Sequence, residues 1–157
     1  MNITEILGKN SVRVDLESTT KEDVLAELVD LLVEAGSIKK ADKSDVIKKI
    51  KEREVLGSTG IGKGVAIPHA KSAKVKKMVA AFGVSKKGLD FKSLDGEPTY
   101  LFFILIAPGE TPGPHLKALA KISRLLDDKF TRERLCSCAT APEVVKIIKD
   151  EESKKKA

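Results

Sequence analysis

The most constraining feature of this sequence is an unbroken apolar segment, YLFFILIA, at residues 100–107. It is far shorter than the roughly 20 residues that a helix needs to span a bilayer. A strand that is apolar on both faces must have both faces covered, and helices are the usual cover. The segment therefore predicts the central strand of a sheet that lies between layers of helices.

Three other segments have the character of short strands. Residues 12–16 (VRVDL) alternate between apolar and polar side chains, and residues 65–67 and 78–84 are short apolar runs bounded by Gly, Pro or Lys. Residues 86–99 (KKGLDFKSLDGEPT) are rich in turn-forming residues, so we expect turns there.

Apolar residues at helical spacing predict helices before and after these strands. The first helix follows a capping box, with Thr19 as N-cap and Glu22 at the third helical position, and ends at Gly36. A second helix begins near Asp42 and reaches Arg53 or Glu54.

The C-terminal third of the chain predicts a further group of helices. After a rigid loop at residues 108–114, a helix opens at His115, and two shorter helices are expected around residues 131–136 and 140–149. Some connections between strands are too short for parallel crossovers. We therefore predict a single α/β domain over residues 1–150, with a mixed sheet of about five strands flanked by helices, and a basic disordered tail at residues 151–157.

Composition narrows the function classes. The 157 residues are 41% hydrophobic and 33% charged, as in a soluble globular domain, and residues 1–10 lack a targeting signal, so we expect a cytoplasmic protein without membrane insertion. The net charge of +6 would attract nucleic acid, but the chain has one Tyr and no Trp, so we expect no nucleic-acid partner. Cys136 and Cys138 are too few for a metal site.

The segment GSTGIGKGVAIPHAK at residues 57–71 is the strongest candidate site, and it first suggests a nucleotide-binding loop. Residues 57–63 match most of the P-loop pattern, but Gly64 stands where Ser or Thr would hold Mg²⁺. A charged helix end also precedes the loop, where a P-loop has a buried strand. We therefore predict no nucleotide cofactor and no metal.

The alternative is a site centred on histidine. Glycines leave backbone N–H groups accessible to an anion, and Pro68 stiffens the backbone that leads to His69. The chain has two histidines, and the second, His115, is predicted at a helix N-terminus, which attracts anions. An ordinary surface or core histidine is the simpler interpretation of each. Candidate phosphate-binding residues beside His69 are Arg53, Ser58, Thr59, Gly60 and Lys63.

The sequence resembles a known family over nearly its whole length. Four features carry the likeness: the ERE-x₂-GSTGIG entry, the IPH motif, the strand at residues 102–107 and the segment PHLKALAKISRLL. They resemble the enzyme IIA proteins of the bacterial sugar phosphotransferase system, of the fructose/mannitol type that includes nitrogen-regulatory IIA proteins. The resemblance implies a mixed sheet flanked by helices. It also implies that His69 is phosphorylated, that His115 is its partner in the pocket, and that Arg53 faces the phosphate.

The same resemblance implies a phosphocarrier. The chain would accept a phosphoryl group from the phosphocarrier HPr on His69 and pass it to a IIB domain or use its phosphorylation state in nitrogen-type regulation. It is too short to hold a IIB domain, so we expect the acceptor, including one docked at a membrane permease, to be a separate polypeptide. The lysines around the site do not suit the basic surface of HPr. A non-catalytic module that binds partner proteins is the alternative.

Overall fold

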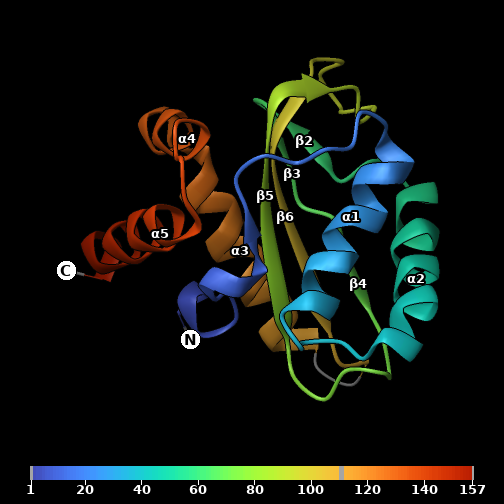
Figure 1. Ribbon diagram of the computed structural model, residues 1–157. Coiled ribbons are helices and arrows are strands. Elements are labelled where there is room, and N and C mark those ends of the chain that lie inside the picture. The colour runs from blue at the N-terminus through green and yellow to red at the C-terminus, as the bar shows by residue number, and fades with distance from the viewer. Residues whose placement is uncertain (1, 110–111, 157) are drawn as a thin grey trace.

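A computed structural model describes residues 2–109 and 112–156, and it places a mixed sheet between two layers of helices (Figure 1). Strand β6 lies inside this sheet, antiparallel to β5 and parallel to β3 and β4. The predicted fold class and central strand are confirmed. The strands of the described residues are β1 (Val12–Arg13), β2 (Gly60–Gly62), β3 (Val65–Ala66), β4 (His69–Lys71), β5 (Val79–Leu89) and β6 (Thr99–Ala107).

Alternate residues of β6 face opposite helical layers. Phe103 and Leu105 pack in the apolar cluster under one layer, whereas Phe102 and Ile104 pack in the cluster under the other. Both faces of this strand are thus buried from Leu101 to Ala107, which is why the sequence of β6 shows no alternation. One layer consists of α1 (Lys21–Glu34) and α2 (Lys43–Val55), and the other of α3 (Pro112–Asp127), α4 (Lys129–Cys136) and α5 (Ala141–Lys156).

Several helix boundaries differ from the prediction. The N-cap of α1 is Thr20, whose hydroxyl accepts the N–H of Asp23 at 3.2 Å, one residue later than expected. Helix α3 begins at Pro112, so His115 lies inside its first turn and does not open the helix. Helix α5 continues to Lys156, past the boundary predicted at residue 150, and its Glu152 accepts the backbone N–H of Ile3 at 2.7 Å.

The prediction of turns over residues 86–99 is wrong for residues 86–89, which belong to a strand. Strand β5 continues through Lys86 and Lys87 to Leu89, and its register against β6 shifts between Val84 and Leu89. Gly88, with a φ of +76°, lies in this irregular stretch, where a side chain would be strained. An irregular strand of this kind lacks the alternating pattern by which strands are recognised.

The glycine-rich segment is a hairpin over part of its length, whereas only residues 65–67 within it were predicted to be a strand. Strand β2 pairs antiparallel with β3 through a two-residue turn. The turn residues Lys63 and Gly64 have φ values of 58° and 77°, as a type I′ turn requires. None of the described helices is long and apolar enough to cross a membrane.

Candidate functional site

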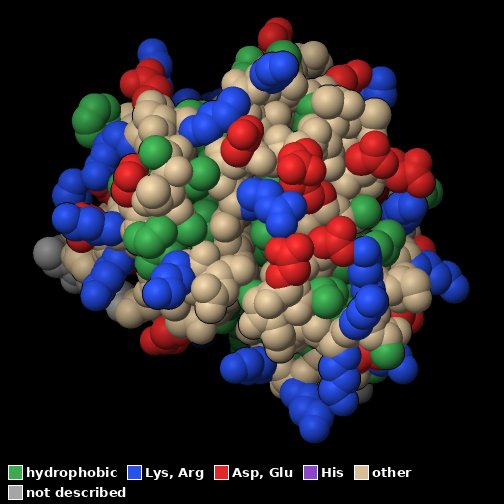
Figure 2. All heavy atoms as spheres, viewed as in Figure 1, with side chains coloured by type: hydrophobic (Ala, Val, Ile, Leu, Met, Phe, Trp, Pro, Cys, Tyr) green, Lys and Arg blue, Asp and Glu red, His purple; other side chains and the backbone are tan. Residues whose placement is uncertain are grey.

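The two histidines meet in a cavity of about 460 Å³ at the edge strand β4. The cavity lies between α2, which covers one face of the sheet, and α3, which covers the other. Neither histidine appears on the face of the molecule shown in Figure 2. The described lining residues are Lys49, Glu52, Arg53 and Leu56 from α2 and its C-cap, His69, Ala70 and Lys71 from β4, and His115, Leu116 and Leu119 from α3.

The backbone around His69 fixes which ring nitrogen is available. His69 pairs with Leu105 of β6, and the carbonyl of Pro68 accepts the N–H of the same leucine at 3.0 Å. The Nδ1 atom of His69 lies 2.8 Å from the carbonyl oxygen of Ile67. A carbonyl oxygen can only accept, so Nδ1 carries the hydrogen and donates it. The lone pair of the neutral ring is therefore on Nε2.

The surroundings of His69 keep its ring neutral. Burial lowers the pKa of His69 below its usual value of 6.5, and the guanidinium of Arg53 lowers it further. The hydrogen bond to Ile67 and the charge of Glu54 act in the opposite direction, but burial prevails. Near neutral pH the Nε2 lone pair is consequently free to attack an electrophile.

His115 is the more buried of the two rings, with 4% of its surface exposed. Its ring meets that of His69 edge to face, with centroids 5.5 Å apart and planes inclined by 72°. Its Nδ1 is buried and has no hydrogen-bond partner in the described part of the chain. Burial, then the charges of His69 and Lys71, lower the pKa of His115 to about 4. The simpler interpretation of His115 as a surface residue is wrong, and the ring is neutral at physiological pH.

Arg53 brings a permanent positive charge to the cavity from the last turn of α2. One guanidinium nitrogen donates to the carbonyl oxygen of Gly57 at 2.8 Å, which restrains the side chain. The other N–H groups of the guanidinium are not committed to that bond.

The next residue, Glu54, fixes the segment that follows α2. Its carboxylate, with 7% of the side chain exposed, accepts the N–H and the hydroxyl of Thr59 and pairs with Lys21 at 2.8 Å. No pattern in the sequence indicates this anchoring role of Glu54.

Four residues proposed to bind phosphate do not line the cavity. Ser58 Oγ accepts the N–H of Gly60 at 3.0 Å and donates to a main-chain carbonyl at 3.3 Å. Thr59 is buried against the carboxylate of α2, and Lys63 pairs with Asp127 at 2.7 Å. Ser58, Thr59 and Lys63 thus bind groups outside the cavity, and the structure brings together only His69, His115 and Arg53 of the predicted set.

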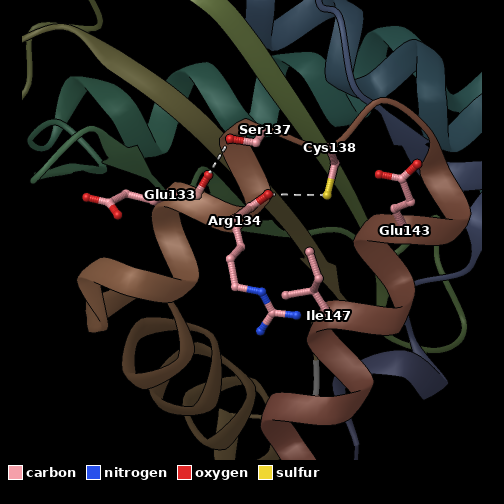
Figure 3. A pocket seen from close by; sticks show the side chains of 6 residues that line it. All are labelled: Glu133, Arg134, Ser137, Cys138, Glu143 and Ile147. Atoms are coloured by element: carbon pink, nitrogen blue, oxygen red, sulfur yellow. Dashed lines mark hydrogen bonds between the residues drawn. The ribbon is translucent and has the colours of Figure 1, made fainter.

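A second hollow lies between α4 and α5 (Figure 3), and it shares no described lining residue with the histidine cavity. Cys138 points into it, and its thiol donates to the carbonyl oxygen of Arg134 at 3.4 Å. Burial raises the pKa of both Cys136 and Cys138, so neither thiol is activated. No group of three metal-binding side chains occurs within the described residues. The histidine cavity is therefore the better candidate site.

Fold and site together define an α/β protein with a histidine-centred pocket at the edge of a mixed sheet. The family model described as "Phosphoenolpyruvate-dependent sugar phosphotransferase system, EIIA 2" matches residues 5–151. The chain therefore belongs to the EIIA 2 family of that phosphotransferase system, as the sequence resemblance predicted.

The chain resembles both a sugar-specific component of the phosphotransferase system and a nitrogen regulatory protein. It is 40% identical over 94% of its length to the fructose-specific EIIABC component of Bacillus subtilis, of which it spans only 23%. The solved nitrogen regulatory protein IIA-Ntr of Neisseria meningitidis superposes with a TM-score of 0.85 at 37% identity, covering 93% of this chain and 98% of that one. The Escherichia coli IIA mannitol chain, solved in complex with phosphorylated IIB, shares the fold (TM-score 0.76, 20% identity, covering 91% and 96%).

Proposed function

We propose that this protein is a histidine phosphocarrier. It accepts a phosphoryl group from phosphorylated HPr on Nε2 of His69 and transfers it to a cysteine of a IIB domain, or it uses its phosphorylation state to regulate another protein. The observation that carries this proposal is the hydrogen bond from Nδ1 to the carbonyl of Ile67, because it leaves the lone pair of a neutral ring on Nε2. Both exchanges would take place in the cytoplasm.

In the first step, Nε2 of His69 attacks phosphorus in line with the P–N bond of the donor histidine. A new N–P bond forms, the donor bond breaks, and its electron pair returns to the donor ring. The His69 ring gains positive charge while Nδ1 keeps its proton, so the carbonyl of Ile67 stabilises the product through the same hydrogen bond. The step therefore needs no separate general base.

The phosphoryl oxygens gain negative charge at the transition state, and the cavity supplies the opposite charge. We assign this stabilisation to Arg53, whose remaining N–H groups can hold two phosphate oxygens in a fork. His115, neutral at physiological pH and edge to face with His69, can donate an N–H to the phosphate or restrain the His69 ring. In the second step a cysteine thiolate attacks phosphorus, an S–P bond forms, and the lone pair returns to Nε2.

The alternative, a module that binds partner proteins without accepting phosphate, is tested by phosphorylation itself. The chain is incubated with phosphoenolpyruvate, enzyme I and HPr. We expect phosphate that is labile in acid and stable in alkali, and we expect it to disappear in His69→Ala. Absence of phosphate with the cognate donor would favour the binding module. Incubation with labelled ATP alone, where we expect no incorporation, controls for a nucleotide-dependent activity.

Transport and regulatory roles are separated by the acceptor. Phosphorylated protein, freed of donor, is mixed with a fructose-type IIB domain. Rapid appearance of a cysteine phosphate on IIB supports the transport role. Phosphate that stays on His69 under these conditions supports the regulatory role, for which the segment GSTGIGKG at residues 57–64 gives a slight preference.

A further inference from the structure

Glu54 is a nearly buried carboxylate that lies next to Arg53 in the chain but outside the histidine cavity. Its side chain is 7% exposed, and it is not among the described residues that line the cavity. Burial of a carboxylate is unfavourable unless partners balance its charge and donate hydrogen bonds to its oxygens. The partners of Glu54 therefore indicate what this carboxylate does so close to the site.

These partners come from α1 and from the segment that follows α2. Lys21, in the first turn of α1, places its ammonium 2.8 Å from Glu54 Oε2 and 4.5 Å from the ring centroid of Phe91. Both carboxylate oxygens accept the N–H of Thr59 at 3.2 Å, and Oε1 also accepts the Thr59 hydroxyl. Because Thr59 is buried, these charge-assisted bonds are shielded from water. Glu54 thus ties Thr59 to the two helices that lie side by side in Figure 1.

Thr59 is in turn bonded to the segment that carries the reactive histidine. Its carbonyl oxygen accepts the N–H of Ile67 at 3.0 Å. The carbonyl oxygen of Ile67 accepts the hydrogen on Nδ1 of His69 at 2.8 Å. Pro68, which stands between Ile67 and His69, has a fixed φ and restricts the residue before it, so the backbone has little freedom to adjust this bond. The position of the Ile67 carbonyl therefore depends on Thr59, and the position of Thr59 depends on Glu54.

The segment that Glu54 holds also carries the contact of Arg53. The guanidinium donates to the carbonyl oxygen of Gly57 at 2.8 Å, two residues before Thr59. The N–H of Gly57 donates to the main-chain carbonyl of Glu54 at 3.1 Å. This short segment is therefore fixed at both ends by the last turn of α2, and it connects Arg53 to the backbone that orients His69.

We propose that Glu54 is a positioning residue for phosphoryl transfer, which holds the His69 ring in the tautomer whose lone pair is on Nε2. It acts through Thr59 and the carbonyl of Ile67. The inference rests on the proposed function, to which it adds a residue that lies outside the cavity. Without the hold on Thr59, the Ile67 carbonyl would move and its bond to Nδ1 would weaken. The neutral ring would then also populate the tautomer with hydrogen on Nε2, which has no lone pair there to attack phosphorus.

A role in stability alone is the competing explanation for Glu54, and Glu27 offers a matched control for it. Glu27 is also a nearly buried carboxylate, with 9% of its side chain exposed, and it pairs with Arg13 at 2.9 Å. Its other hydrogen bonds come from residues 17–18, and neither these nor Arg13 are among the described lining residues of the cavity. Glu27→Gln should therefore weaken the fold in the same way as Glu54→Gln, without an effect on His69.

The test reads the tautomer of His69 from the ¹⁵N chemical shifts of its ring nitrogens, in unphosphorylated protein at pH 7.5 and at a temperature where every variant is folded. We expect the ratio of the Nδ1–H to the Nε2–H tautomer to fall about fivefold in Glu54→Gln, because a neutral amide holds Thr59 less tightly than a carboxylate. Phosphorylation of His69 by phosphoramidate, a small P–N donor, should slow by about tenfold in the same variant. Both quantities should match the wild type in Glu27→Gln.

Substitutions of Thr59 test the same connection if Glu54→Gln does not fold. Thr59→Val removes the hydroxyl that Glu54 accepts and keeps the backbone N–H, so it should shift the tautomer ratio of His69 in the same direction. Thr59→Ser restores the hydroxyl and should return the ratio to that of the wild type.

The outcomes separate failure of this inference from failure of the proposed function. A wild-type tautomer ratio or a wild-type rate in Glu54→Gln, or equal changes in Glu27→Gln, would overturn the positioning role while leaving the phosphocarrier intact. If Glu54→Gln does not fold, a wild-type ratio in Thr59→Val would overturn it. If neither phosphoramidate nor phosphorylated HPr labels the wild type, the proposed function is wrong, and this inference fails with it.

Discussion

Protonation of the buried His115 should make the protein less stable in mild acid. The native state holds the pKa of this ring at about 4, whereas an exposed histidine in the unfolded chain has a pKa of about 6.5. As the pH falls below 6.5, the unfolded state binds a proton that the native state refuses until the pH is near 4. The contribution of the neutral His115 ring to the free energy of unfolding is thus fully present above pH 6.5, and it is lost as the pH falls from 6.5 to 4.

The size of this loss follows from the two pKa values. A difference of about 2.5 pKa units corresponds to about 3.4 kcal/mol in the free energy of unfolding. About 2 kcal/mol of this is lost when the pH has fallen to 5. Replacement by glutamine removes the titrating group and leaves the other acid-sensitive groups in place. The wild type should therefore lose about 2 kcal/mol more than His115→Gln when the pH falls from 7.5 to 5.0.

The assay is urea unfolding followed by far-UV circular dichroism, because the chain has no Trp to report by fluorescence. The free energy of unfolding is measured at both pH values for each protein, so a change in stability common to both pH values cancels. The rings of His69 and His115 are 5.5 Å apart and titrate as a pair, so His69→Gln and the double variant complete the cycle. Equal losses for the wild type and His115→Gln would refute the reasoning.

Three other substitutions, one of them with a matched control, test separate parts of the structure. Arg53→Lys keeps the charge but loses the planar fork, so phosphoryl transfer should slow by about ten- to a hundredfold with an unchanged melting temperature; unchanged transfer would contradict the assigned role. Glu54→Gln weakens a nearly buried ion pair and should cost about 2–4 kcal/mol in urea unfolding. Gly83→Ala places a Cβ 2.7 Å from Leu16 Cδ1 and should cost about 1–3 kcal/mol, whereas Gly8→Ala, with open space at that Cβ, should cost less than 1 kcal/mol.

The layered fold could be predicted because its strongest signals are local. The apolar run of residues 100–107 can be buried only as an inner strand, and the helical spacing of the apolar residues places α1 and α2 within a residue or two. The extension of β5 through Lys86 and Lys87 could not be predicted in this way, because its pairing with β6 there is irregular and its lysines are exposed.

The site was predictable only in part. His69, His115 and Arg53 lie together as the family resemblance implied, but Ser58 and Thr59 point elsewhere although they are close to His69 in sequence. In a hairpin, neighbouring residues face opposite sides, so closeness along the chain does not place side chains in one cavity.

Buried carboxylates were the other feature that sequence reasoning missed. Glu27 lies on the apolar side of α1 and accepts hydrogen bonds from Ser18 and from the backbone N–H groups of residues 17 and 18, and it pairs with Arg13 at 2.9 Å. Burial alone would raise the pKa of Glu27, but these hydrogen bonds lower it overall. The partners come from the end of β1 and from the loop that follows it, which has no regular pattern, so only the folded chain reveals why a charge is tolerated there.

The most direct test of the account is the position of the phosphoryl group on the histidine rings. The chain has only two histidines, so ¹⁵N-histidine labelling and NMR can follow each ring nitrogen after incubation with phosphoenolpyruvate, enzyme I and HPr. The account predicts phosphorus bonded to Nε2 of His69, with Nδ1 still protonated and the ring of His115 unmodified. Phosphorus on Nδ1 of His69, or on either nitrogen of His115, would contradict it.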